Sequence, residues 1–307
     1  MMDNDERKDQ LINDINALRK QRKAVILAHY YQPRDIQDIA DFVGDSLQLA
    51  QQAARTDADV IVFCGVHFMA ESAAILSPEK TVLLPEPSAG CPMADMVEAN
   101  RLKEAKTKLP GAKVVCYVNS SAEVKAVSDI CCTSSNAEKI VQSLGKEEIL
   151  FVPDGNLGGY IAAKTNRKIN LWPGFCPTHH RLAREDILKA REEHQGAKVL
   201  VHPECREEVW READYVGSTA GIIKYAENST DTEFIIGTEC GILHELTKRC
   251  PGKQFYMASA HMICPNMKKI SLQKVKDTLS NMAPVVTVSK EIREKAVCAL
   301  ERMLAVQ

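Results

Sequence analysis

The sequence predicts an α/β fold of three pseudo-symmetric αβα modules, each with a small parallel sheet, around a central active site. Three Cys-Pro pairs carry this prediction, because they recur at Cys91, Cys176 and Cys264 with gaps of 85 and 88 residues. An interval of that length corresponds to a small domain. The spacing therefore indicates one ancestral unit repeated three times. A fourth Cys-Pro pair, at Cys250, lies outside this register.

Strand-like segments provide landmarks that are independent of the cysteines. Apolar runs rich in β-branched residues start the three repeats at KAVILAH (23–29), AKVVCYVN (112–119) and AKVLVHPE (197–204). Three sets of residues then recur at spacings of 88 and 85 residues: His29, Tyr117 and His202; Asp41, Asp129 and Asp214; Ser46, Ser134 and Thr219. The repeat therefore extends well beyond the cysteines.

Segments of helical period lie between the apolar runs, as in LQLAQQAART (47–56), AEKIVQSLG (137–145) and GIIKYAENS (221–229). Strands that alternate with helices indicate parallel βαβ units with right-handed crossovers. We therefore predict a four-stranded parallel sheet covered by helices in each module.

The predicted modules comprise residues 1–95 with 271–307, residues 96–185, and residues 186–270. The helical segments at 5–21 and about 271–307 lie outside the repeat, and we expect them to pack on the first module.

Composition excludes several classes of partner. The net charge is -2 and no long Lys/Arg run occurs, which argues against nucleic-acid binding. No apolar stretch approaches the roughly 20 residues of a membrane helix, and the polar, acidic start MMDNDERKDQ is unlike a signal peptide. Eleven cysteines, several of them inside apolar strand-like runs, favour a reducing cytoplasm over a disulfide framework.

The three repeated cysteines are candidate metal ligands, although an isolated cysteine after a strand is more often a small buried hydrophobe. The chain has no C-x-x-C pair, which argues against a zinc ribbon or a ferredoxin-type site. Three convergent thiolates can instead hold a [4Fe–4S] cluster at three of its irons. The fourth iron is then open to act as a Lewis acid.

A small, multiply anionic ligand is indicated by Ser46, Ser134 and Thr219, each of which precedes a helical segment. Ser and Thr are favoured N-caps whatever the function. Three such helix starts on one cavity would nevertheless offer N–H groups and hydroxyls to carboxylates or phosphate. The segment GSTAG (217–221) is the best phosphate candidate, because its glycines would let the backbone approach closely.

Polar residues at the ends of the first strands are acid–base candidates, because parallel sheets carry ligand groups at the carboxyl ends of their strands. They are His29, Tyr31, Tyr117, Asn119, His202 and Glu204. A desolvated Glu204, two residues after His202, is expected to act as a general base near neutral pH. His179, three residues after Cys176, is a further candidate to which the sequence gives no role.

Nine short motifs follow one another in a fixed order: AHYYQP (28–33), GDS (44–46), GCPMADM (90–96), YVNS (117–120), CTSSN (132–136), WPGFCPTH (172–179), HPEC (202–205), GSTAG (217–221) and CPNMK (264–268). Together they resemble quinolinate synthase, the iron–sulfur enzyme family of de novo NAD biosynthesis, over about residues 23–268. The resemblance implies three modules around one [4Fe–4S] cluster per chain, with Cys91, Cys176 and Cys264 as its ligands.

The resemblance also implies the reaction and its residues. The family condenses iminoaspartate with dihydroxyacetone phosphate to form quinolinate, with release of phosphate and water, and it is linked functionally to an L-aspartate oxidase or dehydrogenase. Glu204, Tyr31, His29 and His202 are the implied catalytic residues. The implied substrate-binding residues are His29, Ser46, Tyr117, Asn119, Ser134, His202, Pro203, Glu204, Ser218 and Thr219. Some members carry C-x-x-C-x-x-C at the third ligand, whereas Cys264 stands alone in CPNMK, so no local disulfide switch is expected.

Two other readings of the same cysteines stay open at this point. One is a [4Fe–4S] hydro-lyase that acts on another polycarboxylate. The other is a zinc-stabilised or redox-sensing binding protein without catalytic activity. A brown, iron-containing protein would favour the enzymes, and a colourless zinc protein would favour the binding module.

Overall fold

The computed structural model describes residues 4–306 and forms three parallel sheets of four strands each. Their strand orders are β2-β1-β3-β4, β6-β5-β7-β8 and β10-β9-β11-β12, so the same order is repeated three times. The predicted class, three αβα modules with small parallel sheets, is therefore confirmed. The chain divides into two compact units: the residues up to Cys91 with Pro265–Arg293, and Pro92–Cys264 with the residues from Glu294 on.

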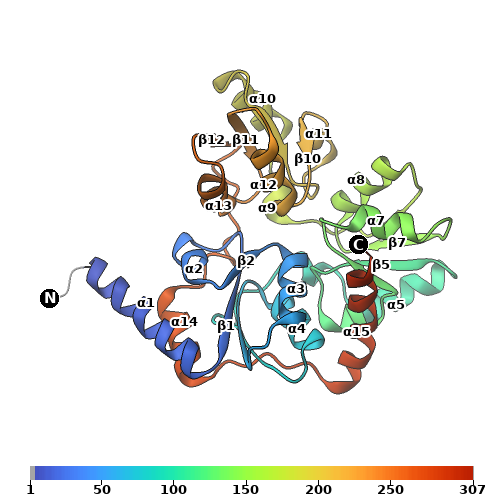
Figure 1. Ribbon diagram of the computed structural model, residues 1–307. Helices are drawn as coiled ribbons and strands as arrows, with labels where there is room; N and C mark the ends of the chain where they lie inside the picture. Colours follow the sequence, from blue (N-terminus) through green and yellow to red (C-terminus); the bar gives the residue numbers. More distant parts are fainter. Residues whose placement is uncertain (1–3, 307) are drawn as a thin grey trace. The chain divides into compact units, whose positions relative to one another are not determined.

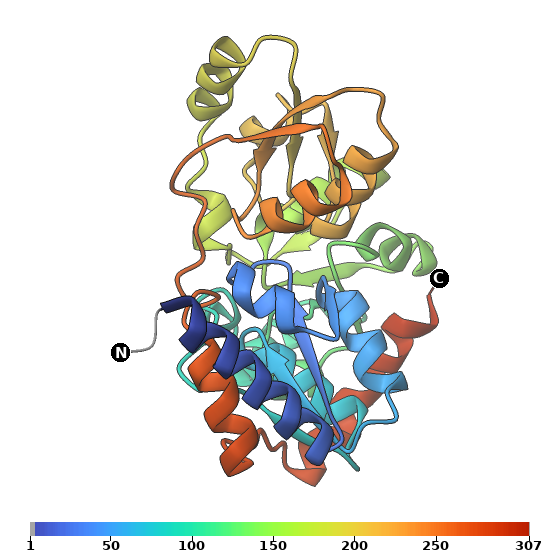
Figure 2. The same cartoon turned by 60° about the vertical axis from the view of Figure 1, so that its left-hand side comes forward.

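The first unit contains one sheet and the helices that cover it. Its strands are β1 (Ala24–His29), β2 (Phe42–Gly44), β3 (Val60–Cys64) and β4 (Thr81–Leu83). Its helices are α1 (Asn4–Gln21), α2 (Arg34–Ile39), α3 (Ser46–Arg55), α4 (His67–Leu76) and α14 (Leu272–Asn281). Helices α1 and α14 lie side by side in both views (Figures 1 and 2). Their apolar residues, such as Ile15 and Val275, share one buried cluster with Ile26 and Val62 of the sheet.

The second unit contains the other two sheets. The strands of the second module are β5 (Lys113–Tyr117), β6 (Ile130–Cys132), β7 (Ile149–Val152) and β8 (Asn170–Leu171). Its helices are α5 (Ala99–Lys108), α6 (Ala122–Ala126), α7 (Ala137–Ser143), α8 (Gly155–Thr165) and α9 (Pro177–His180), with a 3₁₀ turn η1 at Ala94–Met96. The strands of the third module are β9 (Lys198–Val201), β10 (Tyr215–Val216), β11 (Glu233–Gly237) and β12 (Gln254–Met257). Its helices are α10 (Arg184–Glu193), α11 (Glu207–Trp210), α12 (Thr219–Asn228) and α13 (Ile242–Arg249).

The last helix, α15 (Lys290–Ala305), is divided between the two units. Its end contacts the second module, because the Arg302 guanidinium donates to the Asp129 carbonyl (2.6 Å) and Asn136 donates to the Met303 carbonyl (3.4 Å). The expectation that the C-terminal helices pack on the first module therefore applies to α14 and not to the end of α15. The exact limits of the three modules stay a prediction. Within residues 4–306, no helix is long and apolar enough to span a membrane.

The repeated aspartates have the same structural role in all three modules. In each, the carboxylate accepts the backbone N–H of a residue in the first strand, and the aspartate N–H donates back to the carbonyl of that residue. The pairs are Ile26–Asp41, Val114–Asp129 and Val199–Asp214, and the N–H to carboxylate distance is 2.8 Å in every pair. A basic residue of the helix before the first strand of each module pairs with the aspartate. These residues are Arg19 of α1, Lys106 of α5 and Arg191 of α10. Identical contacts at identical register confirm the internal repeat at the level of single atoms.

Candidate active site

The first module places His29 and Tyr31 directly after its first strand. His29 ends β1, and its Nδ1 accepts the backbone N–H of Tyr31 at 3.1 Å. The imidazole proton is therefore on Nε2. Lys268 donates to the Tyr31 carbonyl (2.6 Å) and Gln32 contacts the Met267 sulfur (3.4 Å), so residues of the CPNMK motif hold this loop.

Cys91 lies in a loop after β4, and the same C-terminal segment holds that loop. Lys269 donates to the carbonyl of Ser88 at 2.7 Å. The Cys91 side chain is half-buried. The segment that follows Cys264 is thus attached to two candidate loops of the first unit.

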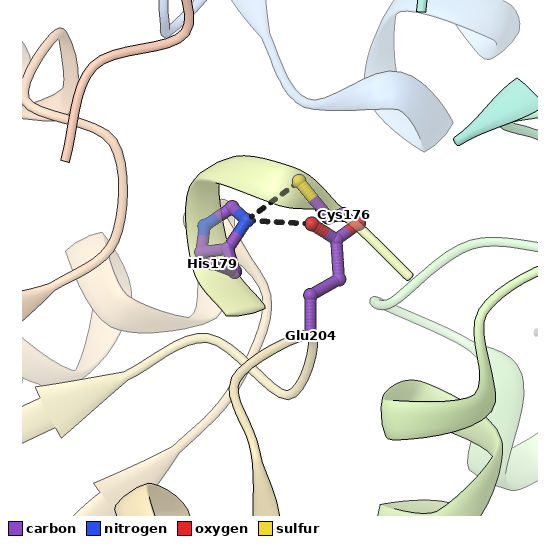
Figure 3. Close-up of side chains that lie close together, drawn as sticks. All are labelled: Cys176, His179 and Glu204. Atoms are coloured by element: carbon purple, nitrogen blue, oxygen red, sulfur yellow. Dashed lines mark hydrogen bonds and ion pairs between the residues drawn. The ribbon is translucent and has the colours of Figure 1, made fainter. Parts of the chain in front are cut away.

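In the second unit, Glu204 is the centre of a buried polar cluster. The Tyr117 hydroxyl donates to Glu204 Oε1 at 2.6 Å, and His179 Nδ1 lies 2.6 Å from Glu204 Oε2. Tyr117 ends β5, His179 belongs to α9, and Glu204 follows β9 after His202 and Pro203. All three side chains that meet here are buried. Figure 3 shows the Glu204 carboxylate and Cys176 on one side of the His179 ring.

His202 lies next to this cluster and keeps the local geometry seen at His29. Its Nδ1 accepts the backbone N–H of Glu204 at 3.3 Å, so its proton is on Nε2, which lies 3.2 Å from the Ser134 hydroxyl. The His202 and His179 rings stack with centroids 4.7 Å apart. Burial lowers the pKa of His202 to about 3, although the Glu204 carboxylate acts in the opposite direction. His202 is therefore a neutral hydrogen-bonding group at neutral pH.

The pKa of Glu204 corrects one expectation from the sequence. Burial alone would raise the pKa of this carboxyl, as the sequence reading assumed. The neighbouring His202 and His179, together with hydrogen bonds from His179 and Tyr117, outweigh burial and hold the pKa below its usual range. Glu204 is thus an ionised acceptor with two donors already in place, and it is a weak base until one of them moves away.

The three hydroxyl residues before helices are not the helix caps. Asp45 caps α3 by accepting N–H groups from Leu47 and Gln48, and Ser218 caps α12 by accepting the N–H of Gly221. Ser46 and Thr219 are each one residue further on, in the first turn. Ser134 precedes Asn136, the residue before α7, and reaches His202 instead. The helices start where the sequence predicted. Asp45 caps α3 in place of Ser46, and Ser218 caps α12 in place of Thr219, because each supplies an acceptor one residue earlier.

The glycines of GSTAG lie against the Tyr215 side chain. A Cβ on Gly217 would lie 2.5 Å from the Tyr215 hydroxyl oxygen, and one on Gly221 would lie 2.8 Å from the same atom. The Tyr215 side chain therefore occupies the space beside both glycines. A side chain at either position would therefore collide with this ring. The phosphate role of the segment stays a prediction.

Asn119, two residues after Tyr117, has an unsatisfied buried group. Its carboxamide oxygen is buried and has no hydrogen-bond partner within residues 4–306. Asn119 follows Tyr117 by two residues, as Glu204 follows His202. A buried acceptor without a donor is costly unless a ligand or water supplies one.

Two buried acidic residues that the sequence did not single out lie at the ends of strands in the second unit, and one of them holds a cysteine loop. Glu239 is completely buried and accepts the backbone N–H of Cys264 at 3.0 Å. Asp154 is also completely buried and caps α8 through Oδ1, whereas its Oδ2 has no hydrogen-bond partner within residues 4–306. Burial raises the pKa of Asp154 well above its usual value, and the charge of Glu204 raises it further. The two residues are 85 positions apart, so the repeat register itself could have identified them.

Thr238 and Glu239 connect the two cysteine segments at the end of β11. His179 Nε2 lies 2.9 Å from the Thr238 hydroxyl, and the neighbouring Glu239 holds Cys264. His179, to which the sequence gave no role, thus contacts Cys176 (3.3 Å), Glu204 and Thr238.

Comparison with known proteins identifies the family. A family model described as quinolinate synthetase A protein (NadA) matches residues 13–305. The chain belongs to the quinolinate synthetase A family. It is 58% identical over 297 residues to quinolinate synthase 1 of Methanosarcina acetivorans, covering 97% of this chain and 98% of that protein. Quinolinate synthases of Geobacter sp. (strain M21) and Desulforudis audaxviator are 57% and 56% identical over 298 residues, again covering 97% of this chain and 98% of each relative.

Family membership confirms the resemblance drawn from the ordered motifs. The match spans all three modules and includes every cysteine of the repeat. The Glu204 cluster and the three cysteines can therefore be compared with the chemistry of one enzyme family.

Proposed function

We propose that this protein is a quinolinate synthase that condenses iminoaspartate with dihydroxyacetone phosphate to form quinolinate, phosphate and water in NAD biosynthesis. Near-complete coverage by relatives with this name supports the proposal. Its strongest structural support is the buried polar cluster around Glu204, beside Cys176. This cluster consists of residues from the family's motifs: Tyr117, His179, His202 and Glu204. The enzyme would be a condensing transferase with a dehydration step.

The chain offers a donor set suited to one [4Fe–4S] cluster. Thiolates are the preferred ligands of such clusters. Cys91, Cys176 and Cys264 would hold it, and the buried Glu239 already accepts the amide N–H of Cys264. A cluster bound at three irons supplies an open Lewis-acid iron for a dehydration.

Helix starts and strand-end residues would hold the anionic groups of both substrates. Ser46 and Thr219 lie in the first turns of α3 and α12, where their hydroxyl groups would donate to an anion. The caps Asp45 and Ser218 already accept N–H groups of these turns. Ser218, Ser134 and Asn119 add hydroxyl and amide groups. The unsatisfied oxygen of Asn119 is suited to accept a hydrogen bond from a substrate hydroxyl or imine.

Glu204 and Tyr31 would move protons, and His29, His202 and Tyr117 would orient the intermediates. Glu204 starts as an ionised carboxylate that accepts from Tyr117 and His179. A substrate that draws the Tyr117 hydroxyl away removes one donor and raises the pKa of Glu204 toward a useful base. Neutral His202 carries its proton on Nε2, where it donates to Ser134 or to a substrate oxygen. Pro203 fixes the short link between His202 and Glu204.

Iminoaspartate is an imine that water hydrolyses, so an enzyme that oxidises L-aspartate must supply it. An L-aspartate oxidase or dehydrogenase is the proposed functional partner, and a reducing cytoplasm is the expected location for a solvent-accessible cluster. The binding partners proposed here are small molecules only.

Product analysis tests the proposal. Anaerobically reconstituted protein is incubated with dihydroxyacetone phosphate and with iminoaspartate generated in place from L-aspartate by an added oxidase. We expect quinolinate, identified by mass spectrometry, and phosphate in equal amounts. If cluster-loaded protein forms no quinolinate while a known quinolinate synthase does so under the same conditions, the proposed function is wrong.

A further inference from the structure

Three side chains of the second unit bring three different metal-binding atoms together. The ligand atoms of Cys176, His179 and Glu204 all lie within 4.8 Å of one another. His179 Nδ1 is the shared neighbour, at 3.3 Å from Cys176 Sγ and 2.6 Å from Glu204 Oε2 (Figure 3). His179 and Glu204 are buried, and Cys176 is half-buried.

The spacing is close to that of a single tetrahedral ion. Zinc binds thiolate sulfur at about 2.3 Å, and imidazole nitrogen and carboxylate oxygen at about 2.0–2.2 Å. In tetrahedral geometry these bonds separate sulfur from nitrogen by about 3.6 Å and nitrogen from oxygen by about 3.4 Å. The Sγ–Nδ1 pair needs to widen by only about 0.3 Å and the Nδ1–Oε2 pair by about 0.8 Å, which side-chain rotations supply.

The surrounding contacts already orient the three ligands. Metal-bound histidines usually donate their other N–H to a nearby oxygen, which fixes the ring. His179 Nε2 lies 2.9 Å from the Thr238 hydroxyl, so the ring keeps this partner when a metal replaces the proton on Nδ1. Tyr117 holds Glu204 through Oε1 and leaves Oε2 facing His179. The His202 ring stacks on the face of the His179 ring, with centroids 4.7 Å apart.

We propose that, before the iron–sulfur cluster is assembled, Cys176, His179 and Glu204 bind one divalent cation of the zinc or ferrous class. Three protein ligands leave a fourth position for water, as in other three-ligand zinc sites. Binding displaces the proton of the Cys176 thiol, which is released to solvent. The single ring proton of His179 moves from Nδ1 to Nε2, where the Thr238 hydroxyl accepts it. Cys176 is also a proposed cluster ligand, so the cation and the cluster exclude each other; this consequence alone rests on the proposed function.

Cobalt titration of the metal-free, cluster-free protein tests the site without any substrate. We expect one cobalt per chain, with visible ligand-field bands and a near-ultraviolet charge-transfer band that shows thiolate coordination. His179→Ala and Glu204→Gln should each weaken binding by more than the 10–100-fold that is typical for loss of a residue that only orients a ligand. Thr238→Val, which removes only the partner of His179 Nε2, should weaken it by about 10–100-fold.

Two matched variants locate the ion. Cys264→Ser removes another proposed cluster ligand, and His180→Ala removes the neighbouring histidine on α9; both should bind cobalt as the wild type does. Unfolding curves of the metal-free variants show whether each is folded. Absence of thiolate-bound cobalt in the wild type, or equal binding by folded His179→Ala, would overturn the proposal. Loss of binding in Cys264→Ser with retention in His179→Ala would place the ion on the cluster cysteines and would also overturn it.

A second measurement tests the competition separately. Metal-free protein receives one equivalent of zinc and then ferrous iron and sulfide under anaerobic conditions. We expect the cluster absorbance to appear only after a chelator is added, and to appear at once in His179→Ala. Cluster assembly at the same rate with and without zinc would refute the competition. Neither readout uses quinolinate formation, so this inference and the proposed function can fail independently.

Discussion

Replacement of Asp129 by alanine tests whether the repeated aspartates stabilise the modules as the hydrogen bonds suggest. The substitution removes the acceptor for the N–H of Val114, which is completely buried. A buried N–H without an acceptor costs about 1–3 kcal/mol. The ion pair with Lys106 spans 3.4 Å between side chains that are 36% and 32% exposed, and such a pair is worth about 0–1 kcal/mol. Most of the loss should therefore come from the hydrogen bond.

Urea unfolding followed by circular dichroism measures the change. We expect Asp129→Ala to lose about 1–4 kcal/mol, Lys106→Met at most about 1 kcal/mol, and Asp129→Asn an intermediate amount, because its amide oxygen still accepts from Val114. Asp41→Ala and Asp214→Ala should fall in the range of Asp129→Ala, since they break the same contact. A loss in Lys106→Met as large as in Asp129→Ala would show that the ion pair, and not the hydrogen bond to Val114, provides the stabilisation.

Three further predictions concern the active-site cluster. Glu204→Gln should keep the iron–sulfur cluster but lower the rate of quinolinate formation by about 10²–10⁴-fold, the usual range for a lost proton-transfer group; an unchanged rate with normal iron content would exclude Glu204 from this role. Glu239→Ala, which frees the amide of Cys264, should speed cluster loss to a chelator by about 10–100-fold, and unchanged bleaching would contradict its anchoring role. The folded-state pKa of His202 is about 3 against 6.5 for the free side chain, so protons bind preferentially to the unfolded chain and stability falls as pH drops below about 6.5. Between pH 7 and pH 5 the wild type should therefore lose about 2 kcal/mol more than His202→Gln; equal pH dependence in urea titrations would contradict the buried, neutral state.

The repeat could be predicted from the sequence because polar landmarks recur at fixed spacing. His29, Tyr117 and His202 fall at or directly after the ends of the first strands, as the alignment of strand-like runs required. Parallel topology followed from strands that alternate with helices. Asp154 and Glu239 are also 85 residues apart and could have been aligned in the same way. The sequence alone does not show, however, that an acidic residue after a strand is buried.

Details that depend on neighbouring residues could not be predicted. At the start of α3, Asp45 and Ser46 are both good caps, and only the backbone path decides that Asp45 receives the N–H groups. The pKa of Glu204 depends on donors from α9 and β5, which are distant in sequence. His179 gains its position only because α9 brings it against Thr238 and Glu204.

We propose that Cys91, Cys176 and Cys264, one from each module, hold a single iron–sulfur cluster. Iron and acid-labile sulfide are measured per chain in anaerobically purified wild type, in the variants Cys91→Ser, Cys176→Ser and Cys264→Ser, and in the control Cys250→Ser, which changes the Cys-Pro pair outside the repeat. We predict about four of each per chain in the wild type and in the control, and almost none in the three other variants. A full cluster in any of those three variants, or its loss in Cys250→Ser, would show that these three cysteines are not the ligands.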